Sequence, residues 1–262
     1  MYDFEIEEAG VTVAGTDDLI PGKKVILRKW AYNKVTPLAI VSKRYQVIKH
    51  ADVVNQFEQA LDTVGGNFVN RTVTTSLPHY GAKMFRKYTF NDVALEFEPG
   101  DLVKLCLELT NSYDGVMRAG FNLIGHRLVC ENGLIIGEKM QSIHAKHFSS
   151  FDLKDLSQRL ENSIPMFEQA LEHWKEWRNI AISTDGAVEM LKKSLIPAKT
   201  QLEIIEKFKS EQPNKWGLFQ AATWVTSHKY EAKNPENTRL SRHTAEGTLI
   251  PIFYGRKIGG RK

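Results

Sequence analysis

The chain has 262 residues, of which 42% are hydrophobic and 25% are charged. This composition is ordinary for a globular protein with a sizeable core, and it excludes a wholly disordered or fibrous chain. Lysine and arginine exceed aspartate and glutamate by 35 − 31 = 4, so the chain is mildly basic, which permits an anionic partner without requiring one.

The N-terminal residues "MYDFEIEEAG" are acidic and lack the apolar stretch of a signal peptide. No apolar run approaches the roughly 18 residues that a membrane span needs. We therefore expect a cytoplasmic protein with no membrane partner. Its two cysteines, Cys106 and Cys130, lie in apolar runs and are expected to be buried and reduced; a disulfide would require their strands to be neighbours.

Residues 1–37 are predicted to form a weakly ordered arm with one strand-like piece, "KKVILRKWAY". Residues 38–150 are predicted to form an α+β sheet core. The segment 37–48 is rich in β-formers, and "HADVVNQFEQALDTVGG" predicts a helix that Gly65 and Gly66 end. The apolar stripe of this helix consists of Val53, Val54, Phe57, Ala60 and Leu61.

Three strands are expected next, in 67–76, 79–90 and 101–110, the last after the turn "EPGD". Their short connections favour an antiparallel meander. Residues 125–137, "GHRLVCENGLIIG", supply one more strand or a strand-to-helix junction. The predicted fold class is α+β, with an antiparallel meander sheet, a packed helix and a mostly helical C-terminal half.

Residues 151–250 are predicted to be helical and to pack on the core. Apolar residues recur every three or four positions from Leu153 to Trp174, and Pro165 marks a kink or break in this helix. Further helices are expected around 187–194, 200–211 and 214–230, and residues 251–262 form a basic, glycine-rich tail.

Two polar motifs interrupt the apolar region. "TNSYDG" (110–115) is rich in turn-forming residues, and it is either a hairpin turn or a polar loop that meets a ligand. "GHRLVCENG" (125–133) places Arg127 beside an apolar segment, where it either pairs with a carboxylate such as Asp114 or faces a phosphate.

Cations and aromatic rings alternate in the predicted meander. Alternation puts Lys83, Phe85 and Lys87 on one face of their strand and Arg86 and Tyr88 on the other. A groove for single-stranded nucleic acid needs cations that track phosphates and rings that stack on bases, although an ordinary solvated face would show the same pattern. The predicted binding residues are Lys43, Arg44, Tyr45, Arg71, Lys83, Phe85, Arg86, Lys87, Tyr88, Arg118 and Arg127.

His144 and His147 are three residues apart, a spacing that suits two metal ligands on one helical turn. No cysteine or carboxylate cluster completes a ligand set beside them, so exposed helix histidines are the favoured interpretation. The sequence contains no phosphate-binding loop, nucleophile elbow or His-Glu-x-x-His motif. We therefore assign no catalytic residue, metal ligand or cofactor.

Three ordered motifs resemble the phage and plasmid-like family known as domain of unknown function 932. Its expected Asn-Ser-x-Asp-Gly pattern matches Asn111, Ser112, Asp114 and Gly115, and its Arg-x-Val-Cys-x-Asn pattern matches Arg127, Val129, Cys130 and Asn132. A late motif matches Trp216, Gly217, Ala221, Thr223 and His228. Tyr113 and Gln220 depart from the residues expected at their positions, His and Asn, which argues against a strict catalytic role for either.

This resemblance covers roughly residues 25–255 and implies a mobile-element setting, such as a bacteriophage, without an established activity. The order of elements is also similar to the core of single-strand annealing proteins, which form rings or filaments around single-stranded DNA. That second resemblance implies a homo-oligomer, and it concerns architecture alone.

Three functional hypotheses follow. The first is a phage-type protein that binds single-stranded DNA and anneals complementary strands in recombination or replication. The second is a metal-dependent enzyme acting on nucleic acid, with Asp114, His126, Arg127 and Glu131 around one loop. The third is a non-enzymatic adaptor whose helical C-terminal half docks a host or phage protein. This half includes Trp174, Trp177, Trp216 and Trp224, for which core packing is the alternative.

Overall fold

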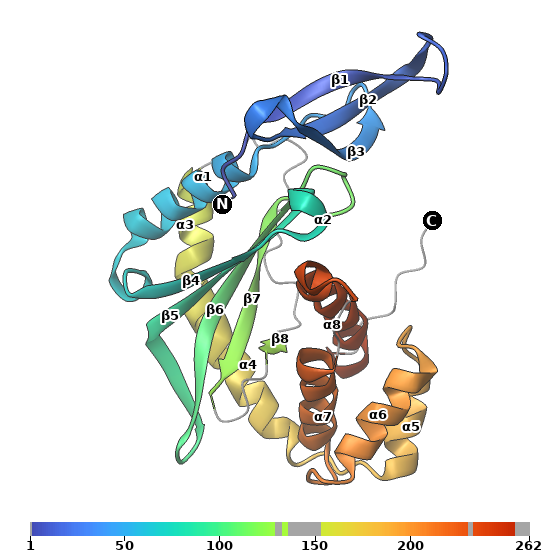
Figure 1. Ribbon diagram of the computed structural model, residues 1–262. Coiled ribbons are helices and arrows are strands. Elements are labelled where there is room, and N and C mark those ends of the chain that lie inside the picture. The colour runs from blue at the N-terminus through green and yellow to red at the C-terminus, as the bar shows by residue number, and fades with distance from the viewer. Residues whose placement is uncertain (1, 129–132, 136–152, 230–232, 255–262) are drawn as a thin grey trace.

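The structure, a computed structural model, describes residues 2–128, 133–135, 153–229 and 233–254. It contains two antiparallel sheets followed by helices (Figure 1), which confirms the predicted α+β class and the helical C-terminal half. The first sheet has the strand order β1-β2-β3 and the second has the order β4-β5-β6-β7-β8.

The N-terminal sheet is the main departure from the predicted arm. Its strands are β1 (Ile6–Thr12), β2 (Leu19–Lys29) and β3 (Val35–Ser42). Ile26, Val41 and Tyr113 form a small apolar core beneath it, separate from the main core. The sequence of β1 showed no clear strand pattern because it contains acidic residues. These acidic residues pair with lysines of β2, as in the Lys24–Glu8 ion pair at 2.6 Å.

The second sheet is the predicted meander, because each strand pairs antiparallel with the next along the chain. The turn between its two longest strands uses Gly100 at φ +81°, a conformation that favours glycine. The strands are β4 (Arg71–Ser76), β5 (Lys83–Glu98), β6 (Asp101–Ser112), β7 (Gly120–Arg127) and β8 (Gly133–Ile135), with the short α2 (Pro78–Gly81) before β5.

One face of this sheet is apolar and packs against α1 (His50–Val64), α3 (Leu153–Glu161) and α4 (Ser163–Trp177). The five predicted stripe residues of α1 are buried, and Gly65 at φ +64° ends the helix as expected. The predicted break in the long helix falls at Asn162. Pro165 therefore lies in the first turn of α4, where its missing N–H costs little.

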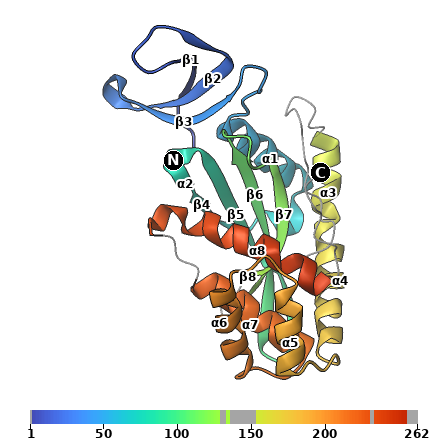
Figure 2. The same ribbon diagram turned by 90° about the vertical axis from the view of Figure 1, so that its right-hand side faces the viewer.

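The remaining helices are α5 (Thr184–Lys192), α6 (Ala198–Phe208), α7 (Lys215–His228) and α8 (Thr238–Tyr254). Helix α8 crosses the face of the sheet opposite α1 and α4 (Figure 2). It includes the first four residues of the predicted basic tail, and the rest of that tail lies outside the described residues. No helix in the described part of the chain combines the length and apolarity needed to cross a lipid bilayer.

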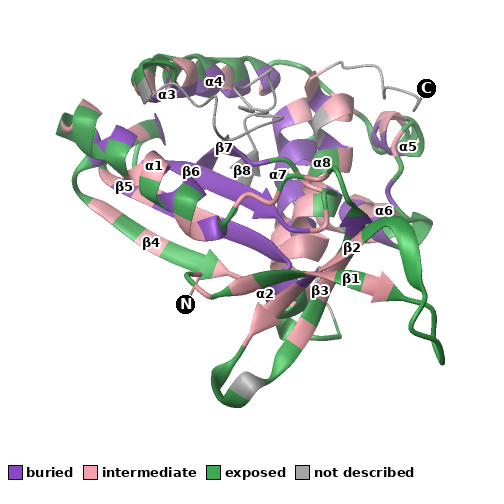
Figure 3. Cartoon of the chain, turned by 90° about the horizontal axis from the view of Figure 1, so that it is seen from above, coloured by how far each residue is buried: buried purple, intermediate pink, exposed green. Residues whose placement is uncertain are grey.

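Burial differs sharply between the two sheets (Figure 3). Strands β5 and β6 are buried along much of their length, whereas residues of the N-terminal sheet are mostly intermediate or exposed. Trp174, Trp177 and Trp216 lie in the main core, which confirms core packing for them. Trp224 is half-buried and stacks on His228. The buried tryptophans therefore offer no surface to an adaptor's partner.

Candidate functional site

The polar motif at residues 111–115 ties the end of β6 to the start of α1. The Asn111 amide donates to the carbonyl oxygen of Ile48 at 2.9 Å and also lies 2.9 Å from Nδ1 of His50. The Tyr113 hydroxyl accepts a hydrogen bond from the backbone N–H of His50 at 3.0 Å. These buried groups satisfy one another, so their contacts give the motif a structural role in joining the two elements.

His50 lies at the centre of this network and is fully buried. Its Nε2 lies 2.9 Å from the carbonyl oxygen of Gly81, and its ring centre lies 4.2 Å from that of Tyr113. Burial lowers the pKa of His50 to about 4, although the bond to Gly81 opposes this shift. The imidazole is therefore neutral at pH 7, with Nε2–H donating to Gly81 and Nδ1 accepting from Asn111.

Arg127 has a carboxylate partner, but the predicted partner was wrong. Its guanidinium binds Asp101 through Nε at 2.7 and 2.9 Å and Nη2 at 2.6 Å, and its Nη1 donates to Oε1 of Gln220 at 2.8 Å. Asp114 lies beyond the other end of β6, about 30 Å away at the rise of a strand. Arg127 thus connects the second and third motifs, and these partners occupy the guanidinium that a phosphate would need.

The cations predicted to line a groove along the sheet are largely neutralised. Lys83 forms an ion pair with Asp114, and Arg71 pairs with Asp62 at 2.8 Å. Arg86 binds Glu58 at 2.7 Å and also donates to Thr75 and Tyr88. Lys87 is half-exposed and lies directly opposite Glu108 on β6. The structure therefore does not form the predicted groove along the meander.

The predicted stacking rings on β5 are buried as well. Phe85 is 2% exposed and lies under α8, with its ring centre 5.0 Å from that of His243. Tyr88 is fully buried against Phe57 of α1 and shares Glu58 with Arg86. Alternation assigned these two rings to opposite faces correctly. Because helices cover both faces here, neither ring is available to a nucleobase.

Four of the predicted residues lie in the two loops that meet at the junction between the two sheets. Lys43 and Arg44 are exposed in the turn after β3, and Arg118 is exposed in the loop after β6. Tyr45 joins the two segments: its hydroxyl donates to the carbonyl oxygen of Ser112 at 3.1 Å, and its ring lies against Gly115. We call Lys43, Arg44, Tyr45 and Arg118 the junction patch.

No described carboxylate lies within ion-pair distance of the three junction-patch cations. Lys49, exposed just before α1, is a further cation on the segment that carries Lys43 and Arg44. Gly115, at φ +70°, leaves room for the Tyr45 ring, since a Cβ there would lie 3.2 Å from it. The motif at 111–115 therefore positions Tyr45 of the junction patch and contributes no cation to it.

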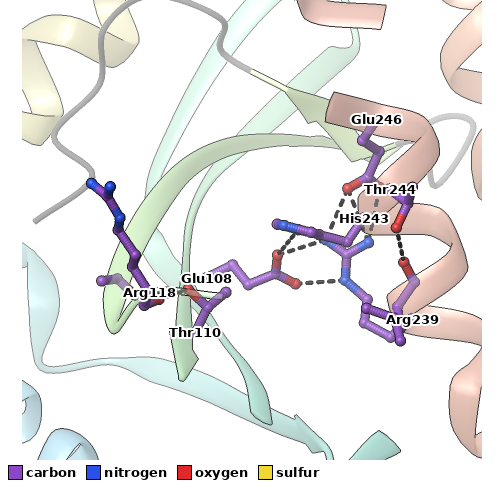
Figure 4. Close-up of polar contacts among 9 residues, drawn as sticks. Glu108, Thr110, Arg118, Arg239, His243, Thr244 and Glu246 are labelled. Atoms are coloured by element: carbon purple, nitrogen blue, oxygen red, sulfur yellow. Dashed lines mark hydrogen bonds and ion pairs between the residues drawn. The ribbon is translucent and has the colours of Figure 1, made fainter. Parts of the chain in front are cut away.

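A second polar cluster, which the sequence did not reveal, lies on the face of the sheet that α8 crosses (Figure 4). Both carboxylate oxygens of Glu108 accept hydrogen bonds from Arg239 at 2.6 Å, and Arg239 also binds Glu246 at 2.9–3.0 Å. His243 approaches Glu108 to 3.6 Å. Figure 4 shows Arg239 and His243 pointing from α8 toward Glu108, while the side chain of Arg118 points away from this cluster.

Glu108 is 2% exposed, so its charge depends on these contacts. Burial raises the pKa of Glu108, but the Arg239 guanidinium and the hydrogen bonds of His243 and Arg239 outweigh burial and lower it to about 2. The sequence signal that could have predicted this cluster is the single glutamate in the apolar run "LCLELT", because a buried charge requires a partner of opposite charge. The cluster holds α8 against the sheet.

The residues of the enzyme hypothesis are not gathered by the structure. Asp114 belongs to the junction end of β6, whereas His126 and Arg127 belong to the opposite end of the sheet. The structure does not describe Glu131 of this hypothesis, the histidine pair or three residues of the second family motif: His144, His147, Val129, Cys130 and Asn132. Cys106 is buried and free, 3.3 Å from the Thr89 hydroxyl. Within the described ranges, no group of three His, Cys, Asp or Glu side chains is placed to hold a metal ion.

The chain was compared with protein families, curated proteins and solved structures. No curated protein and no solved structure matches it. A family described as "Domain of unknown function (DUF932)" matches residues 37–245, well over half of the chain. Strands β1 and β2 lie outside this match, whereas all three sequence motifs lie inside it. The chain therefore belongs to the DUF932 family.

Proposed function

We propose that this protein binds single-stranded DNA and promotes the annealing of complementary strands. The observation that carries the proposal is the junction patch, where exposed cations without described acidic partners lie beside a half-buried tyrosine. Elsewhere on the sheet Arg71, Lys83, Arg86 and Arg127 are paired with carboxylates, so this surface is where backbone phosphates have several cations to bind.

Annealing needs no nucleotide hydrolysis, because base pairing drives it once the repulsion between two phosphate backbones is screened. The proposal places this activity in phage recombination or replication, in the cytoplasm of a host cell. It includes assembly of several copies into a ring or filament, which would align many junction patches along one strand. Electron microscopy with and without single-stranded DNA tests the assembly.

Binding is tested by fluorescence anisotropy with a labelled oligonucleotide across a salt series. Log affinity should fall with log salt concentration by roughly 0.7 for each phosphate contact. The triple variant Lys43→Ala, Arg44→Ala and Arg118→Ala should lower the magnitude of this slope by about 2, because it removes three contacts.

A charge-matched control removes three lysines near α5 and α6 that lie away from the junction: Lys192→Ala, Lys193→Ala and Lys199→Ala. Its slope should equal that of the unmodified protein. Absence of binding at low salt, or an affinity that does not change with salt, would refute DNA binding. Equal slopes for the two triple variants would refute the junction patch as its location.

A further inference from the structure

The exposed aromatic side chains of the described residues gather in one region. They are Trp30, Tyr32 and Tyr80, which are 41%, 101% and 62% exposed. Trp30 and Tyr32 lie in the hairpin between β2 and β3, where η1 (Ala31–Asn33) forms the tip, and Tyr80 lies in α2. Figure 3 shows this hairpin as an exposed projection from the three-stranded sheet. Burial of aromatic surface is strongly favourable, so a cluster of exposed rings indicates a binding surface.

Arg28 connects the hairpin to α2. Its guanidinium carbon lies 3.8 Å from the centre of the Trp30 ring and 4.0 Å from that of Phe4, so it stacks between two rings. Its Nη1 donates to the carbonyl oxygen of Tyr80 at 2.7 Å. Gly81 allows this approach, because a Cβ there would lie 2.7 Å from the Phe4 ring and 3.1 Å from Arg28. Arg28 therefore holds the Trp30 ring close to the backbone of Tyr80.

Backbone strain is found at the same place. Tyr32, His79 and Tyr80 have φ values of +61°, +53° and +59°, and they are the non-glycine residues with positive φ in the described part of the chain. Each such conformation costs on the order of 1 kcal/mol or more, and it persists where neighbouring contacts enforce it. For His79 and Tyr80 these contacts come from the Asn237 side chain, which accepts from the backbone N–H of His79 at 3.1 Å, and from Arg28. Strain of this kind is concentrated at ligand sites.

We propose that Trp30, Tyr32 and Tyr80 form a platform on which unpaired nucleobases stack. This inference rests on the proposed function and supplies the rings that the buried Phe85 and Tyr88 cannot. Stacking on aromatic rings does not depend on base identity, because every base has a π-face. Strand β3 leads from this platform to the junction patch over 8 residues, about 25 Å, so one DNA strand can contact both surfaces.

The platform is tested with two labelled probes of equal length: a normal oligonucleotide and an abasic phosphodiester chain with the same charges. The unmodified protein should bind the normal oligonucleotide at least about 10-fold more tightly. The double variant Tyr32→Ala and Tyr80→Ala should lose most of this preference, because each ring contributes roughly a 5-fold or larger factor and only Trp30 remains. Its affinity for the abasic chain and its salt slope should not change.

Two control variants separate stacking from misfolding. The pair Tyr32→Phe and Tyr80→Phe keeps both rings and should bind as the unmodified protein does. Leu195→Ala removes a side chain that is 73% exposed between α5 and α6 and should have no effect. Circular dichroism checks that each variant is folded.

The outcomes distinguish the platform from the proposed function. If both probes bind equally well and with the expected salt slope, the protein binds DNA but the platform does not stack bases. The same conclusion follows if the double alanine variant retains the preference for the normal oligonucleotide, and the exposed rings would then be assigned to a protein partner. If neither probe binds, the proposed function itself fails.

Discussion

The buried His50 makes a sharp prediction about stability and pH. Its pKa falls to about 4 in the folded protein, against about 6.5 for an unperturbed histidine, because burial disfavours the charged form. As the pH falls below 6.5, His50 binds a proton in the unfolded chain but stays neutral in the folded chain. The stabilisation from neutral His50 is therefore complete above pH 6.5, and it is lost progressively down to about pH 4.

The size of this effect follows from the two pKa values. The full difference corresponds to about 3 kcal/mol, of which about 2 kcal/mol is lost between pH 7 and pH 5. Glu108 contributes in a lower window: its pKa is depressed to about 2, so its stabilisation is present above about pH 4.5 and is lost as the pH falls toward 2. Glu108 therefore contributes little to the change in stability between pH 7 and pH 5.

The assay is urea denaturation at several pH values between 7 and 5, with the unmodified protein and a His50→Gln variant. The variant should be less stable at pH 7 by about 1–3 kcal/mol, since Asn111 and Gly81 lose well-placed partners. Its free energy of unfolding should then change little down to pH 5. His228→Gln, a change at an exposed histidine, serves as the control. If His50→Gln kept the full pH dependence, the assignment of a neutral buried imidazole would be refuted.

Three further predictions concern stability at pH 7 and are measured by urea denaturation. Glu108→Gln leaves Arg239 without the charge of Glu108 and should lower the free energy of unfolding by about 3 kcal/mol. A loss below about 1 kcal/mol would contradict the role of this cluster in holding α8 against the sheet. Arg127→Lys cannot reproduce the forked contact and should cost about 2 kcal/mol, whereas an unchanged midpoint would show that the fork is dispensable. Gly217→Ala would place a Cβ 2.1 Å from the carbonyl oxygen of Gln212 and should cost more than about 2 kcal/mol, so a tolerated alanine would contradict this packing.

Local patterns predicted the helix and the meander because their determinants are close in sequence. The stripe of α1 and its terminal Gly65 lie within one helix, and the turn at Gly100 fixes the neighbouring strands as a hairpin. The strand-like piece "KKVILRKWAY" and the β-rich segment 37–48 indicated parts of β2 and β3, whereas β1 was missed because it contains acidic residues and is mostly exposed. Its ion pairs, such as Lys24–Glu8, are visible only once the strands are paired.

The site could be predicted only in part, because its determinants are distant in sequence. Alternation placed Phe85 and Arg86 on opposite faces correctly, but it carries no information on which helices cover those faces. Arg239 meets Glu108 across 131 residues, and no local pattern links them. Local sequence placed Trp30 and Tyr32 in the strand-like piece "KKVILRKWAY", and it does not show that Arg28 stacks on Trp30 and binds the backbone of Tyr80 in α2.

The central claim is that single-stranded DNA lies across the junction patch and the aromatic platform. The most direct measurement is ultraviolet cross-linking of a photoreactive oligonucleotide, followed by mass spectrometry of the cross-linked peptides. The account predicts cross-links in the peptides that contain residues 30–32, 43–45, 80 and 115–118. Cross-links confined to α5 and α6, or none at all at low salt, would contradict it.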